Sequence, residues 1–240
     1  MERRRRIAAR PALLLACAVA VPAALLTGCS SGGGSGSDDS GSDSGSSGGG
    51  TTSAAGTPTT PALAPAKYAT LPDGCATVGK ATVGALVPKA KSPGGTTAPS
   101  DDARARSGCS WTGNGSDGYQ YRWLSVTLQR FSSTVTASAE QQAKDRFADQ
   151  VAQLGKVPGA AASAVTGVGD QASTVTERAT VAKVTSQNDT LVARTGNVVV
   201  IVEYNGAGLE GKKNPSATTV RDGAARAAKD VVASVAGANG

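Results

Sequence analysis

A run of residues that cannot build a core, residues 30–66, confines any packed domain to the C-terminal part of the chain. Residues 30–50 consist only of Gly, Ser and Asp, and residues 51–66 are rich in Thr, Pro and Ala. Such a composition buries too little apolar surface to offset the entropy lost on ordering. We therefore expect a tether over residues 29–67, with an r.m.s. span of about 35 Å. The Thr/Pro-rich part is either a plain spacer or a carrier of O-linked sugars.

The amino terminus has the pattern of a secretory signal peptide over residues 1–28. Four arginines, residues 3–6, precede an apolar stretch over residues 11–26. This stretch is shorter than the roughly 20 residues of a membrane-spanning helix, so a cleaved leader is favoured over a retained transmembrane anchor. The arginine run also fits a twin-arginine export signal as an alternative to the general route.

The leader ends in Leu26-Thr27-Gly28-Cys29, which resembles the lipobox of bacterial lipoproteins. In a lipobox the cysteine thiol takes a diacylglyceryl group before the leader is cut off, so Cys29 is the expected lipidation site. The alternative is a chance cysteine behind an ordinary secretory signal. Two or three acyl chains, palmitate among them, anchor a protein durably because each buried CH₂ contributes about 0.8 kcal/mol. We expect a lipid anchor on the extracytoplasmic face of the cell membrane.

Charge and composition exclude several function classes. The leader holds five of the 24 Lys and Arg and one of the 18 Asp and Glu, which leaves a formal charge of only +2 on residues 29–240. A nucleic-acid partner is therefore not expected. The chain has no histidine, which removes Ser-His-Asp and Cys-His catalysis and His-bound zinc. Ser-Lys, nucleophile-elbow and EF-hand motifs are also missing, so we expect no catalytic residue, no metal ligand and no cofactor.

Two cysteines remain in the expected domain, which spans residues 68–237. In an oxidising compartment Cys75 and Cys109 are expected to form a disulfide. The chain-entropy model gives such a crosslink about 3 to 4 kcal/mol of stabilisation. A pair of free or metal-binding thiols is the alternative.

Hydrophobic periodicity and turn residues indicate an α+β domain. A capping Ser138 with Gln141 three residues later, and Gly155 at the end, mark the clearest helix. Hairpin-length turns between the strands, including one at Asn188-Asp189, indicate a twisted antiparallel sheet of about six strands with helices on one or both faces. The expected helices are residues 76–86, 139–154 and 216–235, and the expected strands are residues 109–111, 119–131, 173–177, 180–185, 191–194 and 198–204.

Three residues are the candidates for a ligand site, and each has a structural alternative. Asp170, in the turn Gly167-Val168-Gly169-Asp170, either contacts a ligand or accepts backbone N–H bonds in an Asx turn. Arg194, in an expected strand, either binds an anion in a groove or forms an ion pair on the sheet face, for which Glu203 is the suggested partner. Trp111 either lines a pocket or packs over the disulfide in the core.

Several motifs in this order resemble a family of actinobacterial lipoproteins that share a domain of unknown function. They are the lipobox, Cys75 before a short helix, Cys109-Ser110-Trp111, Gly167-Val168-Gly169-Asp170-Gln171-Ala172, and Val192-Ala193-Arg194-Thr195-Gly196-Asn197-Val198-Val199-Val200. The family is similar to mycobacterial envelope lipoproteins and to extracellular sensor domains of some bacterial serine/threonine kinases. The resemblance implies a PsbP-like α/β/α arrangement and binding or sensing, and it transfers no ligand and no catalytic residue.

Together these features predict a non-catalytic envelope lipoprotein that binds a ligand or partner in a groove between the sheet and a helix. The partner classes left open are an envelope protein, a lipid and a glycan. The alternatives are a histidine-free hydrolase or transferase acting on the cell wall, and a purely structural surface protein.

Overall fold

The computed structural model describes residues 62–115 and 117–240. The expected leader, Cys29 and most of the expected tether lie outside these residues, as does Ser116. In the described part, none of the helices combines the length and the apolar character that crossing a bilayer requires.

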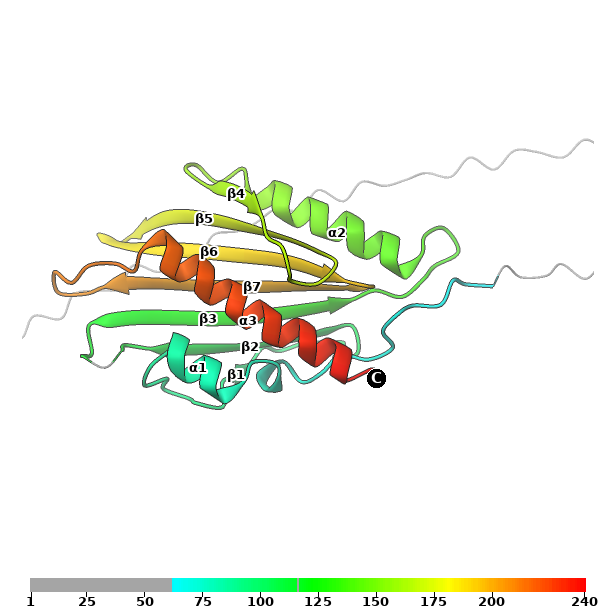
Figure 1. Ribbon diagram of the computed structural model, residues 1–240, viewed down its shortest axis with the longest axis horizontal. Coiled ribbons are helices and arrows are strands. Elements are labelled where there is room, and N and C mark those ends of the chain that lie inside the picture. Colours follow the sequence, from blue (N-terminus) through cyan, green and yellow to red (C-terminus); the bar gives the residue numbers. More distant parts are fainter. Residues whose placement is uncertain (1–61, 116) are drawn as a thin grey trace, which may run out of the picture. The chain divides into compact units, whose positions relative to one another are not determined.

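The described chain forms one antiparallel sheet of seven strands with three α-helices packed on it (Figure 1). The strand order across the sheet is β1-β2-β3-β7-β6-β5-β4. This confirms the predicted α+β class, with one strand more than the six expected. The strands are β1 (Thr96–Thr97), β2 (Arg106–Gly113), β3 (Gln120–Arg130), β4 (Ala161–Ala164), β5 (Gln171–Val181), β6 (Val184–Thr195) and β7 (Val198–Gly208).

Strand β7 lies at the centre of the sheet because its sequence is apolar on both faces. Val198, Val199, Val200 and Val202 are all fully buried. Continuous runs of β-branched residues are typical of strands that are covered on both sides. β7 pairs along its length with β3 on one side and β6 on the other.

Two tight hairpins join β5, β6 and β7, and only one of them has the usual turn residues. Gly196 has φ +52° between β6 and β7, in the first central position, where glycine is favoured in a II′ turn. Between β5 and β6, Ala182 (φ +50°) and Lys183 (φ +68°) both adopt the left-handed conformation. Non-glycine residues pay for that conformation in strain, so this turn is held by the eleven residue pairs of the β5–β6 ladder.

The main core lies between one face of the sheet and the helices α1 (Lys80–Leu86) and α3 (Ala217–Gly237). Ser216 caps α3 by accepting a hydrogen bond from Thr219 N at 3.0 Å. The apolar stripe of α3 is fully buried, including Val220, Val231 and Val235. Figure 1 shows α1 and α3 on the same side of the sheet.

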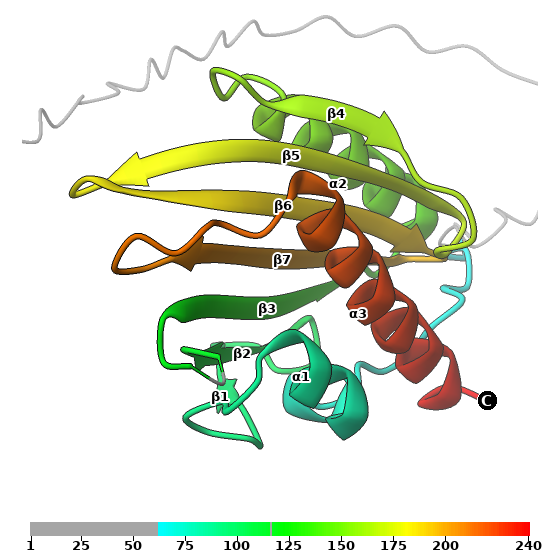
Figure 2. The same ribbon diagram turned by 60° about the vertical axis from the view of Figure 1, so that its left-hand side comes forward.

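A smaller core lies on the opposite face under α2 (Ala139–Leu154), as the turned view in Figure 2 shows. Ser138 caps this helix as predicted, accepting from Gln141 N at 3.1 Å, and Gly155 is its C-cap. Ala143 and Phe147 pack on Val192 and Val199 of the sheet. Helices therefore cover both faces.

Three details of the predicted secondary structure are wrong. The expected helix over residues 76–86 is a 3₁₀ turn, Gly74–Ala76, followed by the separate α1. The short strands β1 and β4 were not predicted because two threonines and the sequence Ala-Ala-Ser-Ala give little signal. The turn expected at Asn188-Asp189 lies in the middle of β6. The chain turns instead at Ala182-Lys183, so residues 180–185 are not one strand as expected but the end of β5, a turn and the start of β6.

Candidate functional site

Helix α1 is short, and the residues after it fold back toward the sheet. Pro88 follows the C-cap Val87 and cannot continue the helix. Lys91 N then donates to Thr112 O on β2 at 2.8 Å, and Lys89 adopts φ +53°, unusual for a side chain with a Cβ. The returning segment, residues 88–95, is thereby tied to β2 after α1 has ended.

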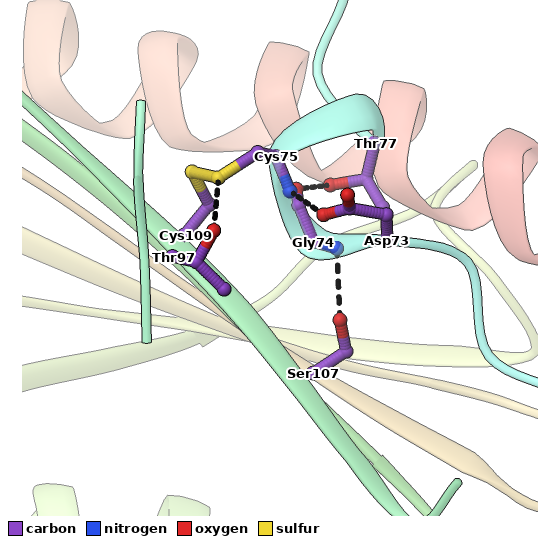
Figure 3. The surroundings of a disulfide bond; sticks show 7 residues. All are labelled: Asp73, Gly74, Cys75, Thr77, Thr97, Ser107 and Cys109. Atoms are coloured by element: carbon purple, nitrogen blue, oxygen red, sulfur yellow. Dashed lines mark hydrogen bonds between the residues drawn. A yellow bond between two sulfur atoms is a disulfide. The ribbon is translucent and has the colours of Figure 1, made fainter. Parts of the chain in front are cut away.

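The disulfide between Cys75 and Cys109 fixes the base of this region (Figure 3). The two Cα atoms are 4.9 Å apart, within the range that a disulfide spans. The bond joins the 3₁₀ turn to β2, and Cys75 N also donates to Asp73 Oδ1 at 2.9 Å. The expected disulfide is therefore present in the structure.

Trp111 lies in the core beside this disulfide and is only 2% exposed. A Cβ placed on Gly95 would collide with Cys109 Sγ and lie 2.8 Å from Trp111 Nε1, so only glycine fits between them and the returning segment. No described residue accepts a hydrogen bond from Trp111 Nε1. The structure thus agrees with Trp111 as a core residue packed near the disulfide.

Between α1 and the returning segment lies a cavity of about 470 Å³, which we call the α1 pocket. Most of its surface is apolar, and two lysines lie at its edge. Its lining residues are Lys80, Val83, Gly84, Val87, Lys89, Ala90, Pro93 and Gly94. A Cβ added to Gly84, an exposed residue of this lining, would meet no atom within 4 Å, so the position has room for a side chain. Clefts of this size with apolar walls and few polar groups are typical of small-molecule sites.

The other two candidate residues, Asp170 and Arg194, bind each other. Arg194 Nη1 lies 3.0 Å from Asp170 Oδ2 and donates to Gly196 O at 2.9 Å, while its Nε donates to Gln171 Oε1 at 2.9 Å. Asp170 Oδ2 also accepts from Gly196 N at 2.7 Å. These contacts brace the β6–β7 turn, so the pair has a structural role.

The suggested ion pair of Arg194 with Glu203 is wrong. Arg194 is opposite Val199 on β7, whereas Glu203 is opposite Thr190. Four residues along a strand separate the two positions, about 13 Å. Glu203 instead accepts from Ser125 Oγ at 2.8 Å.

A buried carboxyl group that was not predicted is that of Asp189, which is 1% exposed in β6. Its two oxygens accept from Thr174 Oγ1 at 2.5 Å and from Thr176 Oγ1 at 2.7 Å. Burial raises the pKa of this carboxyl above its ordinary value, and the nearby Asp222 adds to the rise. The two threonine hydroxyls and Arg221 oppose the rise without cancelling it.

Replacing Asp189 by Asn is expected to stabilise the fold at pH 7. Because the folded state raises the pKa of Asp189, the stability given by its protonated form is present below the ordinary pKa of an Asp and is lost as pH rises through the raised value. An uncharged Asn avoids that loss, so we expect a gain on the order of 1 kcal/mol at pH 7, the typical size of a desolvation cost. Urea denaturation at pH 7 and at pH 3.5 checks this, and the gain should disappear at the lower pH.

The matched control for this substitution is Asp149→Asn on the exposed side of α2. It makes the same chemical change at a solvated position, so stability should stay within about 0.5 kcal/mol of the unmodified protein at both pH values. A destabilised Asp189→Asn variant at pH 7 would show that the carboxylate is itself a stabilising group.

Metal-binding geometry is not found in the described part of the chain, where no three His, Cys, Asp or Glu side chains are grouped closely enough to hold an ion.

Comparison with known proteins finds little that resembles this chain. No protein-family model matches it, and no curated protein matches it. One solved structure is similar, that of LpqN, described as involved in cell envelope biogenesis of Mycobacterium tuberculosis, with 16% sequence identity and a TM-score of 0.24. The likeness covers 56% of this chain and 68% of LpqN. The resemblance to the actinobacterial lipoprotein family therefore stays a prediction from the sequence motifs.

Proposed function

We propose that this protein is an extracytoplasmic lipoprotein, anchored through Cys29, whose folded domain binds the apolar part of a small ligand in the α1 pocket. The observation that carries the binding function is the pocket itself, a cavity of about 470 Å³ with mostly apolar walls. Apolar surface is normally buried in a folded domain. A cavity whose walls are apolar and accessible is therefore the first candidate for a ligand site. The function is binding without turnover.

The composition of the pocket supports a ligand with an apolar body and an anionic end. Pro93 and Ala90 offer accessible apolar surface, which is worth about 25 cal/mol per Å² removed from water. Lys80 in the pocket lining matches a negative charge at one end of the ligand. The lining residues include no acid, hydroxyl or thiol that could act as a nucleophile or base.

Two features support an extracytoplasmic location. The first is the leader with its lipobox at Cys29. The second is the Cys75–Cys109 disulfide, since disulfides persist outside the reducing cytosol. The tether then gives the domain reach from the membrane surface.

Gly84 offers a matched pair of variants that tests the binding function. In Gly84→Leu the side chain is expected to fill the α1 pocket, whereas in Gly84→Ala the single methyl leaves most of the space open. Both should be more stable than the unmodified protein, by about 0.5 to 1 kcal/mol, because glycine is a poor residue inside a helix. We expect decanoate to bind the Ala variant like the unmodified protein and the Leu variant at least about tenfold more weakly, a loss of about 1.4 kcal/mol.

The measurement is a calorimetric titration of decanoate into the chain from residue 30 onward, with thermal melts to verify folding. Equal affinity for the Leu and Ala variants would place the ligand elsewhere. If neither decanoate nor a neutral ligand of the same length bound saturably to the unmodified protein, the α1 pocket would not be a site for apolar ligands.

A further inference from the structure

A second cavity of about 470 Å³ lies where the first turns of α3 meet the sheet edge formed by β4 and β5. We call it the α3 hollow. Its polar lining consists of Ser163 from β4, Arg221 from α3, and four residues of β5 and β6: Thr176, Glu177, Arg178 and Gln187. The strand β4 also contributes small side chains such as Ala161. None of its lining residues belongs to the α1 pocket.

The buried carboxyl group of Asp189 lies on the sheet side of the α3 hollow. Asp189 is 1% exposed and is bonded to Thr176, which lines the hollow, and to Thr174. No Lys or Arg of the described chain lies within 4.0 Å of this carboxylate. A buried carboxylate whose hydrogen bonds come only from neutral hydroxyls lowers the stability of the fold. Destabilising groups of this kind are often kept in binding sites because they serve the function.

The same wall presents hydrogen-bond acceptors to a ligand. Thr176 uses its hydroxyl hydrogen on Asp189, so its oxygen is left as an acceptor. Gln187 uses its amide nitrogen on Glu177 O at 2.9 Å, and its amide oxygen accepts from no described residue. Acceptors backed by a negative charge attract a cationic donor such as an ammonium group.

Two exposed arginines also line the α3 hollow, Arg178 beside Gln187 on the sheet and Arg221 on α3. Neither of them forms an ion pair with a described residue. Guanidinium groups bind carboxylates through two parallel hydrogen bonds. The hollow therefore combines a site for a cation and a site for a carboxylate.

We propose that the α3 hollow binds a small zwitterion, an amino acid or short peptide with a free ammonium and a free carboxylate. The ammonium lies on Thr176 and Gln187 in front of Asp189, and the carboxylate lies between Arg178 and Arg221. A simple anion would make no favourable interaction with Asp189, and a simple cation would make none with the two arginines.

The test is a titration of the dipeptide alanyl-alanine into the full chain reconstituted in lipid nanodiscs, followed by calorimetry. Saturable binding is expected, and it should weaken at least about tenfold for N-acetyl-alanyl-alanine, which lacks the ammonium, and for alanyl-alanine amide, which lacks the carboxylate. Equal binding of the acetylated form would overturn the proposal in favour of an anion site. Equal binding of the amide, or no saturable binding, would also overturn it.

Variants locate the binding. Arg221→Gln and Asp189→Asn are each expected to weaken dipeptide binding at least about tenfold, while Lys229→Gln, the same change of charge two turns further along α3, should alter it less than about twofold. Thermal melts establish that each variant is folded. Unchanged affinity in Arg221→Gln or in Asp189→Asn would overturn the proposal. The Gly84→Leu variant should bind the dipeptide normally, so a failure here is separable from a failure of the α1 pocket.

Discussion

Asn197→Asp is expected to destabilise the domain by about 3 to 5 kcal/mol at pH 7, the largest effect among the substitutions considered. Asn197 is fully buried. Its Oδ1 accepts from Tyr68 N at 2.8 Å, and its Nδ2 donates to Tyr68 O at 3.0 Å and to Phe131 O at 2.7 Å. An Asp cannot donate either of the last two bonds, and its charge would face two carbonyl oxygens away from water.

The consequence reaches three segments of the chain, because this one amide joins the entry to the domain, the end of β3 and the β6–β7 turn. Urea denaturation followed by circular dichroism measures the loss of free energy. A thermal melt should show a fall in Tm of about 10 °C or more. Part of it should return at low pH, where the new carboxyl is protonated.

The control for Asn197→Asp is Asn205→Asp on β7. Asn205 is half-buried and makes no hydrogen bond through its side chain to a described residue, so the same change should cost less than about 1 kcal/mol. If the two variants were equally stable, the side-chain bonds of Asn197 would not hold the three segments together.

Removing the disulfide is the second large change. The double variant Cys75→Ala, Cys109→Ala is expected to lose about 3 to 4 kcal/mol, because the unfolded chain is no longer crosslinked across 34 residues. The loss should also weaken decanoate binding, since Cys109 Sγ lies against Gly95, which follows Gly94 of the α1 pocket lining.

The effect of the disulfide can be separated from the effect of the alanine side chains. Reductant added during urea denaturation should destabilise the unmodified protein by a similar amount and leave the double variant unchanged. A reduced protein that is as stable as the oxidised one would mean that the crosslink contributes nothing to the fold.

The parts of the fold that could be predicted from the sequence are those in which local preference and tertiary packing agree. The helix beginning after Ser138 has a capping residue, an apolar stripe and Gly155 at its end. β7 begins with a run of β-branched residues. Such a run is typical of a strand that is covered on both faces. The disulfide required only the compartment and the number of cysteines left.

The parts that could not be predicted depend on partners distant in sequence. Ala182 and Lys183 form a tight turn without Gly or Asn because long strands on both sides impose it. Asn188 and Asp189 have the composition of a turn, yet hydrogen bonds from Thr174 and Thr176 hold Asp189 inside the sheet.

The candidate site shows the same division. Asp170, Arg194 and Trp111 were chosen because their residue types carry chemistry, and the structure gives each of them a partner or a place in the core. The α1 pocket is built from Val83, Gly84 and other residues that carry no sequence signal for binding. It exists because the returning segment is tied to β2 after α1 has ended, which is a property of the packed domain.

The proposed function depends on the domain being displayed outside the cytoplasm by a lipid anchor, and an intact-mass measurement of the protein purified from the cells that produce it tests this most directly. We predict a chain that begins at position 29 and carries a diacylglyceryl group on Cys29, with the other two cysteines oxidised. A chain that retains residues 1–28, or one with an unmodified thiol at position 29, would contradict the account.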